Sequence, residues 1–447
     1  MPGSYTECSM SYQAAIEQLN SMIPELHVAG NAPRRKFSLE EVRTLLHALG
    51  DPQHGFPSVL IAGTNGKGST ASTLVSILTS SGLRTALYTS PHLARVNERM
   101  RIAGVEIADD DFGQIFWRVE KVGRELLAAG KLPQMPSFFE LITAMAFCWF
   151  GSQGVQVAVL EVGMGGRLDA TNVVDPVLSI LTDISLDHME WLGSTVGAIA
   201  REKAGILRPG GALIRLPQDE EIDAVLNEVQ GNLGARAVDA EKFLPPAGTT
   251  GRYPLLVLGQ GIEIDSPLIG AHQQRNLALA VAAASELANR AEFSCITPAA
   301  IALGVKTTRW PGRMEQFHAL GRDWLLDVAH NPAGARALAA AVSTIMRDKE
   351  NSLLLFSCLR DKPLRQLAEI LFPLFGHILL APIHSPRATT LDELAEVARS
   401  VGSHWELTRS VEEAIEKALA AEPATIVVSG SVYLVGEVRK LLEERER

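Results

Sequence analysis

The chain has 447 residues, of which 47% are hydrophobic and 21% charged, and its formal net charge is −10. This composition is typical of a globular protein and excludes disordered and fibrous classes, while the length allows about two or three domains. The acidic balance disfavours general binding to nucleic acid, so we expect small molecules as partners and no nucleic acid.

The N-terminal segment has no basic start followed by an apolar stretch, so it does not resemble a secretory signal. The longest apolar run, at residues 141–150, is too short to cross a bilayer and predicts a buried helix. Four cysteines, Cys8, Cys148, Cys295 and Cys358, show no spacing typical of a zinc site or disulfide framework. We therefore expect a cytoplasmic monomer without membrane association.

From Ser58 onward, short β-branched runs alternate with helical patterns, which is typical of an α/β fold with a mainly parallel sheet. The first four predicted strands are SVLIA, RTALYT, VQVAVLE and PVLSILTDI, at residues 58–62, 84–89, 155–161 and 176–184. They are apolar almost throughout, so we expect burial on both faces of the sheet.

The order is less regular between Arg201 and Leu303, where we predict a helix at 197–207, a hairpin at 253–264 and a long helix at 271–290. Trp-Pro-Gly then interrupts the pattern and indicates a hinge and a domain boundary near Pro311. The predicted domains are residues 1–311 and 312–447. The second contains predicted strands DWLLDVA, SLLLFSC, HILLAP and TIVVSG, with helices near 332–346, 362–372, 391–401 and 410–421 and a charged final helix.

The strongest functional signal is GTNGKGST, Gly63 to Thr70, between a predicted strand and a predicted helix. Glycines let the backbone wrap around phosphates, N–H groups at the helix start carry partial positive charge, and Lys67 can neutralise the outer phosphates. A glycine-rich turn with a solvated lysine is the alternative, but it does not explain the strand–loop–helix context. The segment therefore predicts a phosphate-binding loop.

The usual magnesium-binding hydroxyl does not directly follow Lys67, because Gly68 stands there and Ser69 comes one residue later. Metal ligands are therefore expected from other strand ends. Ser90, Glu161 and the pair Asp187 and His188 follow three predicted strands, and the carboxyl ends of parallel strands share one edge of a sheet. Oxygen ligands suit magnesium on nucleotide phosphates, and a neutral histidine can complete a second position. Taken singly, a turn, a cap and a satisfied loop histidine explain them as well.

The segment VGMGGRLDATN after Glu161 resembles a dinucleotide fingerprint but lacks its last glycine, because Leu168 stands there. A tight loop that brings Arg167 and Asp169 close to a substrate is the better interpretation, with a simple turn as the alternative. For Lys203, in REKAGIL, a solvated position on a helix is the expectation from the residues alone.

The motifs GTNGKGST, YTSPHL, LEVGMGGRLDATN, SLDH, REKAGI, WPGR, DVAHNP and GSVYLVGEV occur in this order from Ser58 to the end. On these motifs the chain resembles the folylpolyglutamate synthase/dihydrofolate synthase family of the Mur ligase superfamily. The resemblance implies an N-terminal ATPase domain and a smaller Rossmann-like C-terminal domain that closes over the nucleotide.

The resemblance also assigns roles. It implies that Ser90 and Glu161 hold a first Mg²⁺ ion and that His188 and Lys203 serve a second, with Lys203 carbamylated. It implies ATP contacts from Thr64, Asn65, Gly66, Lys67, Gly68 and Ser69 in the loop and from Asn276, Arg313, Asp327 and His330 further along the chain. It places substrate contacts at Ser137, Leu168, Asp169 and Ala170, and a looser match points to residues 34–37.

The activity implied by the resemblance is ligation of L-glutamate to folates, to dihydropteroate or to both. The substrate carboxylate attacks ATP, giving an acyl phosphate that the amino group of glutamate converts to an amide, with Lys67, His188 and Lys203 as catalytic residues. A Mur-type ligase of cell-wall precursors is one alternative, disfavoured because only 62 residues precede Gly63. A P-loop NTPase without ligase activity is the other.

Overall fold

The computed structural model describes residues 11–22, 38–246, 249, 251–346 and 348–446. The predicted substrate contact at residues 34–37 lies outside this range. The chain forms two compact units, the first comprising Met1–Ser90, Asn97–Asp265 and Leu277–Lys306, and the second Pro91–Val96, Ser266–Asn276 and Thr307–Arg447. Two short segments from the first 276 residues thus belong to the second unit, and the domain boundary near Pro311 stays a prediction.

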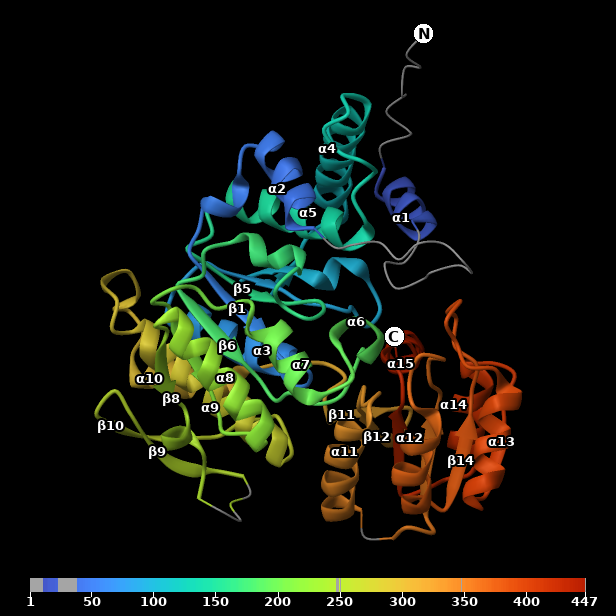
Figure 1. Cartoon of the computed structure of the whole chain (residues 1–447). Helices are drawn as coiled ribbons and strands as arrows, with labels where there is room; N and C mark the ends of the chain where they lie inside the picture. The colour runs from blue at the N-terminus through green and yellow to red at the C-terminus, as the bar shows by residue number, and fades with distance from the viewer. Residues whose placement is uncertain (1–10, 23–37, 247–248, 250, 347, 447) are drawn as a thin grey trace. The chain divides into compact units, whose positions relative to one another are not determined.

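The first unit is built on an eight-stranded sheet of order β4-β3-β2-β5-β1-β6-β7-β8, whose central strands β5, β1 and β6 are labelled in Figure 1. The strands are β1 Ser58–Ala62, β2 Thr85–Tyr88, β3 Met100–Ile102, β4 Val105–Glu106, β5 Val157–Glu161, β6 Leu178–Leu181, β7 Ala212–Arg215 and β8 Arg236–Asp239. The neighbouring strands β2-β5-β1-β6-β7-β8 all pair in parallel. Strand β3 pairs antiparallel with β2 and with β4. The predicted mainly parallel α/β class is therefore confirmed.

Ten helices belong wholly or partly to this unit within the described residues: α1 Tyr12–Ser21, α2 Leu39–Ala48, α3 Lys67–Ser80, α4 Asp109–Ala128, α5 Phe138–Ser152, α6 Met189–Leu192, α7 Val196–Ala204, α8 Glu220–Leu233, α9 Ala271–Leu287 and α10 Pro298–Thr307. Helix α3 packs on β1, β2 and β5, and the predicted apolar helix is α5, whose residues Glu140–Phe150 are all buried. A separate hairpin consists of β9 Tyr253–Val257 and β10 Gln260–Ile264. No helix in the described part of the chain is both long and apolar enough to span a membrane.

The second unit contains a six-stranded sheet of order β11-β12-β16-β13-β14-β15. Its elements are β11 Glu315–Ala319, β12 Arg322–Leu326, α11 Pro332–Ile345, β13 Ser352–Phe356, α12 Leu364–Leu371, β14 His377–Leu380, α13 Leu391–Val401, β15 Trp405–Leu407, α14 Val411–Ala420, β16 Thr425–Ser429 and α15 Val432–Glu446. Only β11 runs antiparallel to its neighbour.

Two hydrophobic cores lie on opposite faces of this second sheet. Leu354 and Val427 belong to one core, whereas their chain neighbours Leu353 and Val428 belong to the other. Successive side chains of a strand point to opposite faces, so the nearly continuous apolar sequence of these strands reflects burial on both sides. The carboxyl ends of the parallel strands in each sheet remain the edge at which polar residues gather.

Candidate active site

The phosphate loop connects β1 to α3 and depends on two glycines with positive φ. Gly63 has φ 152° and Gly66 has φ 88°, both outside the range that most residues adopt. A Cβ atom on Gly63 would stand 1.8 Å from Thr182 Oγ1, so no side chain fits between the ends of β1 and β6. The following residue, Lys67, begins α3, which directs the first N–H groups of that helix at the loop.

The Lys67 side chain folds back over the loop. Its Nζ donates to the carbonyl oxygens of Gly63 at 3.1 Å and Thr64 at 3.2 Å. These two bonds hold the ammonium group beside the turn that the sequence predicts to bind phosphates, and a third hydrogen can still be donated to an anion.

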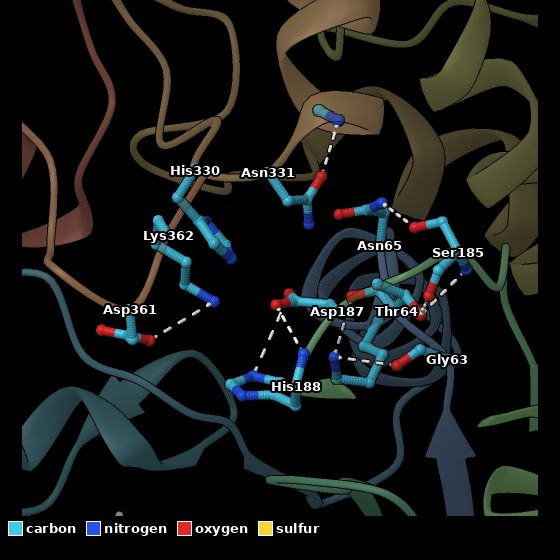
Figure 2. Close-up of polar contacts among 12 residues, drawn as sticks. Gly63, Thr64, Asn65, Ser185, Asp187, His188, His330, Asn331, Asp361 and Lys362 are labelled. Atoms are coloured by element: carbon cyan, nitrogen blue, oxygen red, sulfur yellow. Dashed lines mark hydrogen bonds and ion pairs between the residues drawn. The ribbon is translucent and has the colours of Figure 1, made fainter. Parts of the chain in front are cut away.

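The loop after β6 is bound to the phosphate loop by five hydrogen bonds. The N–H groups of Thr64 and Asn65 donate to the Asp183 carbonyl at 2.9 and 3.1 Å. The Thr64 hydroxyl donates to Ser185 O and accepts from Ser185 N, both at 3.0 Å, and Asn65 Nδ2 donates to Ser185 Oγ at 3.3 Å. Figure 2 shows both loop residues facing Ser185. The two loops therefore form one rigid element.

Ser90 and Glu161 stand side by side at the ends of β2 and β5. The Ser90 N–H donates to Glu161 Oε2 at 3.2 Å, and the Glu161 side chain is only 5% exposed. Glu161 pairs with Ile61 of β1, two residues before Gly63, so it lies at the same sheet edge as the phosphate loop. A carboxylate and a hydroxyl there are hard oxygen donors, which fit Mg²⁺ bridging to phosphate oxygens.

His188 adopts a left-handed backbone conformation, φ 50°, at the start of α6. Non-glycine residues rarely do so, and such positions concentrate at functional sites. Its N–H donates to Asp187 Oδ1 at 2.9 Å, and its ring Nε2 lies 4.0 Å from Asp187 Oδ2 (Figure 2). Asp187 therefore orients a histidine whose ring remains partly accessible.

Lys203 is buried, with 4% of its surface exposed, so the expectation of a solvated helical lysine is wrong. Its Nζ donates to Gly63 O at 2.7 Å, the same carbonyl that Lys67 contacts. Burial above all, and then the Lys67 charge, lower the pKa of Lys203 to about 7, although Asp187 and Asp169 act in the opposite direction. The amine is consequently neutral in a large fraction of molecules near neutral pH.

The glycine-rich loop after β5 packs directly on the last turn of α7. A Cβ on Gly166 would lie 2.8 Å from the carbonyl oxygens of Glu202 and Lys203, and one on Gly205 would lie 2.4 Å from the Arg167 Cβ. Arg167 donates to Glu202 through both Nε and Nη2, at 3.1 and 2.9 Å. Gly166 and Gly205 therefore let the loop and the helix approach closely, and this packing determines the position of Lys203. The described side-chain contacts of Arg167 are with Glu202.

The predicted substrate contacts in this loop differ in environment. Asp169 is buried, and its carboxylate accepts from Met164 N at 2.9 Å and from Thr171 N at 3.0 Å. Burial raises the pKa of Asp169, and those hydrogen bonds oppose the change. Leu168 is 36% exposed, whereas Ala170 is buried. Asp169 thus shapes the loop, and Leu168 is the side chain most accessible to a ligand.

Ser137, the remaining predicted substrate contact, is the N-cap of α5. Its hydroxyl accepts from Glu140 N at 3.3 Å, and Glu140 Oε2 accepts from Ser137 N at 2.7 Å, forming a capping box. Helix capping is a sufficient structural reason for a serine here. Substrate contact by Ser137 stays a prediction.

In the second unit, the buried carboxylate of Asp327 follows β12. It accepts from Met314 N and Ala329 N, both at 2.9 Å. Burial raises the pKa of Asp327, while the charges of His272 and Arg313 oppose that change. The predicted residues Asp327 and Arg313 therefore share one electrostatic cluster, and His272 is a member that the sequence did not indicate.

The other two predicted nucleotide contacts are also fixed within the second unit. His330 Nδ1 lies 2.8 Å from Val328 O, and because a carbonyl can only accept, this nitrogen carries the proton and Nε2 carries a lone pair in the neutral ring. Asn276 is buried in α9 and donates from Nδ2 to Gln273 Oε1 at 2.9 Å.

Comparison with known families and proteins identifies relatives over nearly the whole chain. Residues 61–284 match the Mur ligase middle domain, and residues 312–432 match the Mur ligase, glutamate ligase domain. The chain is 33% identical to folylpolyglutamate synthase of Lacticaseibacillus casei, over 97% of this chain and 99% of that protein. It is 32% identical to dihydrofolate synthase/folylpolyglutamate synthase of Bacillus subtilis, over 91% and 95%.

Solved structures give the same result. Mycobacterium tuberculosis folylpolyglutamate synthase complexed with ADP and AMPPCP superposes with a TM-score of 0.85 at 30% identity, covering 98% of this chain and 99% of that one. Escherichia coli FolC in complex with DHPP and ADP superposes with a TM-score of 0.83 at 27% identity, covering 99% and 100%.

Proposed function

This chain belongs to the folylpolyglutamate synthase/dihydrofolate synthase family of Mur ligases, and we propose that the residues described above carry out its ATP-dependent ligation. The protein is a ligase that adds L-glutamate to folates, to dihydropteroate or to both. The observation that carries the site assignment is the convergence of Lys67 and Lys203 on the Gly63 carbonyl. Both side chains are thus held at the turn that the sequence predicts to bind phosphates.

Ser90 and Glu161 are the residues that would hold a magnesium ion, since they offer adjacent oxygen donors beside the phosphate loop. When bound there, Mg²⁺ would neutralise phosphate charge and polarise the γ-phosphate. His188 would serve a second ion, with the Asp187 carboxylate bound to the His188 N–H and 4.0 Å from its ring Nε2.

The reaction begins when a carboxylate oxygen of the folate or pteroate substrate attacks the γ-phosphorus of ATP. The bond to the bridging oxygen breaks, ADP leaves, and an acyl phosphate forms. The amino group of glutamate then attacks the acyl carbon, loses a proton and expels phosphate, leaving an amide. Lys67 keeps the transferred phosphoryl group next to the loop and offsets its negative charge, which is the main catalytic requirement of phosphoryl transfer.

We propose in addition that Lys203 is carbamylated. The reaction consumes the neutral amine and CO₂, forms an N–C bond and releases one proton. Burial makes the neutral amine available, because it lowers the pKa of Lys203 to about 7. The product is an anionic oxygen donor at the phosphate loop, and intact-mass analysis of the protein in bicarbonate should show the mass of one added CO₂.

A product assay tests the proposed ligase. The protein is incubated with ATP, Mg²⁺ and glutamate, and with dihydropteroate or tetrahydrofolate in separate reactions, and products are identified by mass. We expect one added glutamate per ADP and no ADP release when the acceptor is omitted. Equal ADP release with and without acceptors would instead support a non-ligase NTPase, and turnover only with a nucleotide-sugar acceptor would support a cell-wall ligase.

A further inference from the structure

The parallel ladder between β6 and β7 ends where the site begins. Its last pair is Leu181 with Arg215, after which the β7 chain reaches Pro217. Proline has no N–H group and cannot continue a ladder. The carbonyl of Thr182 therefore needs another donor at this edge.

The side chain of Gln218 provides that partner. Ile184 N–H donates to Gln218 Oε1 at 2.6 Å, and Gln218 Nε2 donates to Thr182 O at 3.4 Å. In a parallel ladder, one residue bonds to the groups on either side of the residue it faces. The carboxamide has the donor and acceptor of a peptide group, so it reproduces this pattern opposite Asp183.

Gln218 is itself held in place. Its N–H donates to Asp223 Oδ2 at 3.1 Å, and Asp223 Oδ1 accepts from Arg215 Nη1 at 2.6 Å. The side chains of Arg215 and Asp223 are 17% and 26% exposed, so this ion pair is shielded from solvent. The carboxamide is thus anchored on the first turn of α8.

Asp183 lies opposite the carboxamide and also binds the phosphate loop. Its carbonyl accepts from Thr64 N and Asn65 N, and the same segment continues to His188. We propose that Gln218 is a positioning residue for ligation, whose carboxamide fixes the Asp183 peptide and thereby the phosphate loop. The inference rests on the proposed role of that loop in binding ATP.

Two variants separate the hydrogen bonds from side-chain volume. Gln218→Met keeps the length of the side chain and removes both bonds, whereas Gln218→Glu keeps the acceptor for Ile184 N–H and loses the donor. The control is Gln156→Met, because Gln156 Oε1 accepts from Arg84 N at 2.8 Å beside the amino ends of β2 and β5. It loses a comparable side-chain to backbone bond at the opposite edge of the same sheet.

The measurements are kcat and KM for ATP in the ligation assay, the melting temperature, and amide hydrogen exchange at Thr64 and Asn65 in the nucleotide-free protein. Loss of one or two hydrogen bonds corresponds to about a tenfold fall in kcat/KM for ATP in Gln218→Met. We expect kcat/KM for ATP to fall about threefold in Gln218→Glu. Hydrogen exchange at Thr64 and Asn65 should be faster in both Gln218 variants, and Gln156→Met should change neither kcat/KM nor exchange.

A lower melting temperature in Gln218→Met with unchanged kcat/KM and unchanged exchange would overturn the proposal, since the residue would then be only structural. If Gln218→Met does not fold, the same comparison in Gln218→Glu decides. If the wild-type protein forms no folate product, the proposed function fails, while exchange at Thr64 and Asn65 still decides the role of Gln218.

Discussion

Replacing Glu161 by Gln separates the chemistry of the site from its stability. Gln keeps an acceptor for the Ser90 N–H, 3.2 Å away, and removes one negative charge from a side chain that is 5% exposed. Removing a buried charge offsets the weaker hydrogen bond, so we expect the free energy of unfolding without metal to change by no more than about 1 kcal/mol.

The effect on turnover should be far larger. A charged oxygen ligand to a magnesium ion contributes several kcal/mol to stabilising the transferring phosphate. A loss of about 4 kcal/mol lowers kcat/KM by about 1,000-fold, and the Mg²⁺ concentration needed for half-maximal activity should rise.

The assay is coupled ADP release at varied Mg²⁺, together with urea denaturation in chelator. Glu120→Gln is the matched control, because Glu120 is also a buried carboxylate of the first unit but pairs with Arg124 on α4. Turnover of Glu161→Gln within tenfold of wild type at ordinary Mg²⁺ would refute the metal assignment.

Three further predictions concern the loop, the helix contact and pH. Lys67→Ala should keep the fold and lower kcat/KM for ATP by at least about 100-fold, measured in the same assay; near-normal turnover would contradict the assignment. Gly205→Ala should destabilise the protein by about 1 to 3 kcal/mol in urea, because its Cβ would lie 2.4 Å from the Arg167 Cβ; unchanged stability would show that the contact relaxes freely. The third prediction concerns His377, whose ring centroid lies 4.6 Å from that of His404. Burial above all, and then the His404 charge, lower the pKa of His377 from 6.5, so the unfolded chain binds more protons than the folded one in this pH range. This contribution to stability is full above pH 6.5 and is lost as pH falls towards the lowered pKa; melting curves of His377→Phe should be flatter over that range, and an unchanged pH dependence would contradict this.

The parts of the site that the sequence predicted well are those that local rules determine. The phosphate loop needs only a strand, glycines that tolerate positive φ, and a helix start, all within a dozen residues around Gly63 and Lys67. The meeting of Ser90 with Glu161 follows from parallel strands, whose carboxyl ends share one edge. Both expectations about position match the structure, while the roles of these residues stay proposals.

The parts that the sequence did not predict depend on contacts between distant segments. Burial of Lys203 results from the packing of α7 against the loop after β5, and that packing cannot be derived from the pattern of either segment. Ser185 contacts the Thr64 hydroxyl through its own backbone groups, and the Gln218 carboxamide contacts the backbone of Thr182 and Ile184. Both contacts join residues far apart in the sequence, so no local pattern indicates them. Strands β3, β4, β7, β8, β11 and β15 were also not predicted. They lie towards the edges of their sheets and are only partly buried, so they lack the continuous apolar run that indicates a buried strand.

The environment of Lys203 favours loss of its positive charge. Gly63 O accepts hydrogen bonds from both Lys67 and Lys203, and the first of these lysines disfavours the proton on the second. Asp187 and Asp169 act in the opposite direction, but burial is the largest effect and the pKa of Lys203 remains lowered. A fold selected for stability alone would not bury an amine beside another cation, because uncompensated buried charge is costly. Carbamylation of Lys203 removes that second cation and leaves Lys67 to face the phosphates of ATP, so the proposed modification explains why Lys203 is buried here.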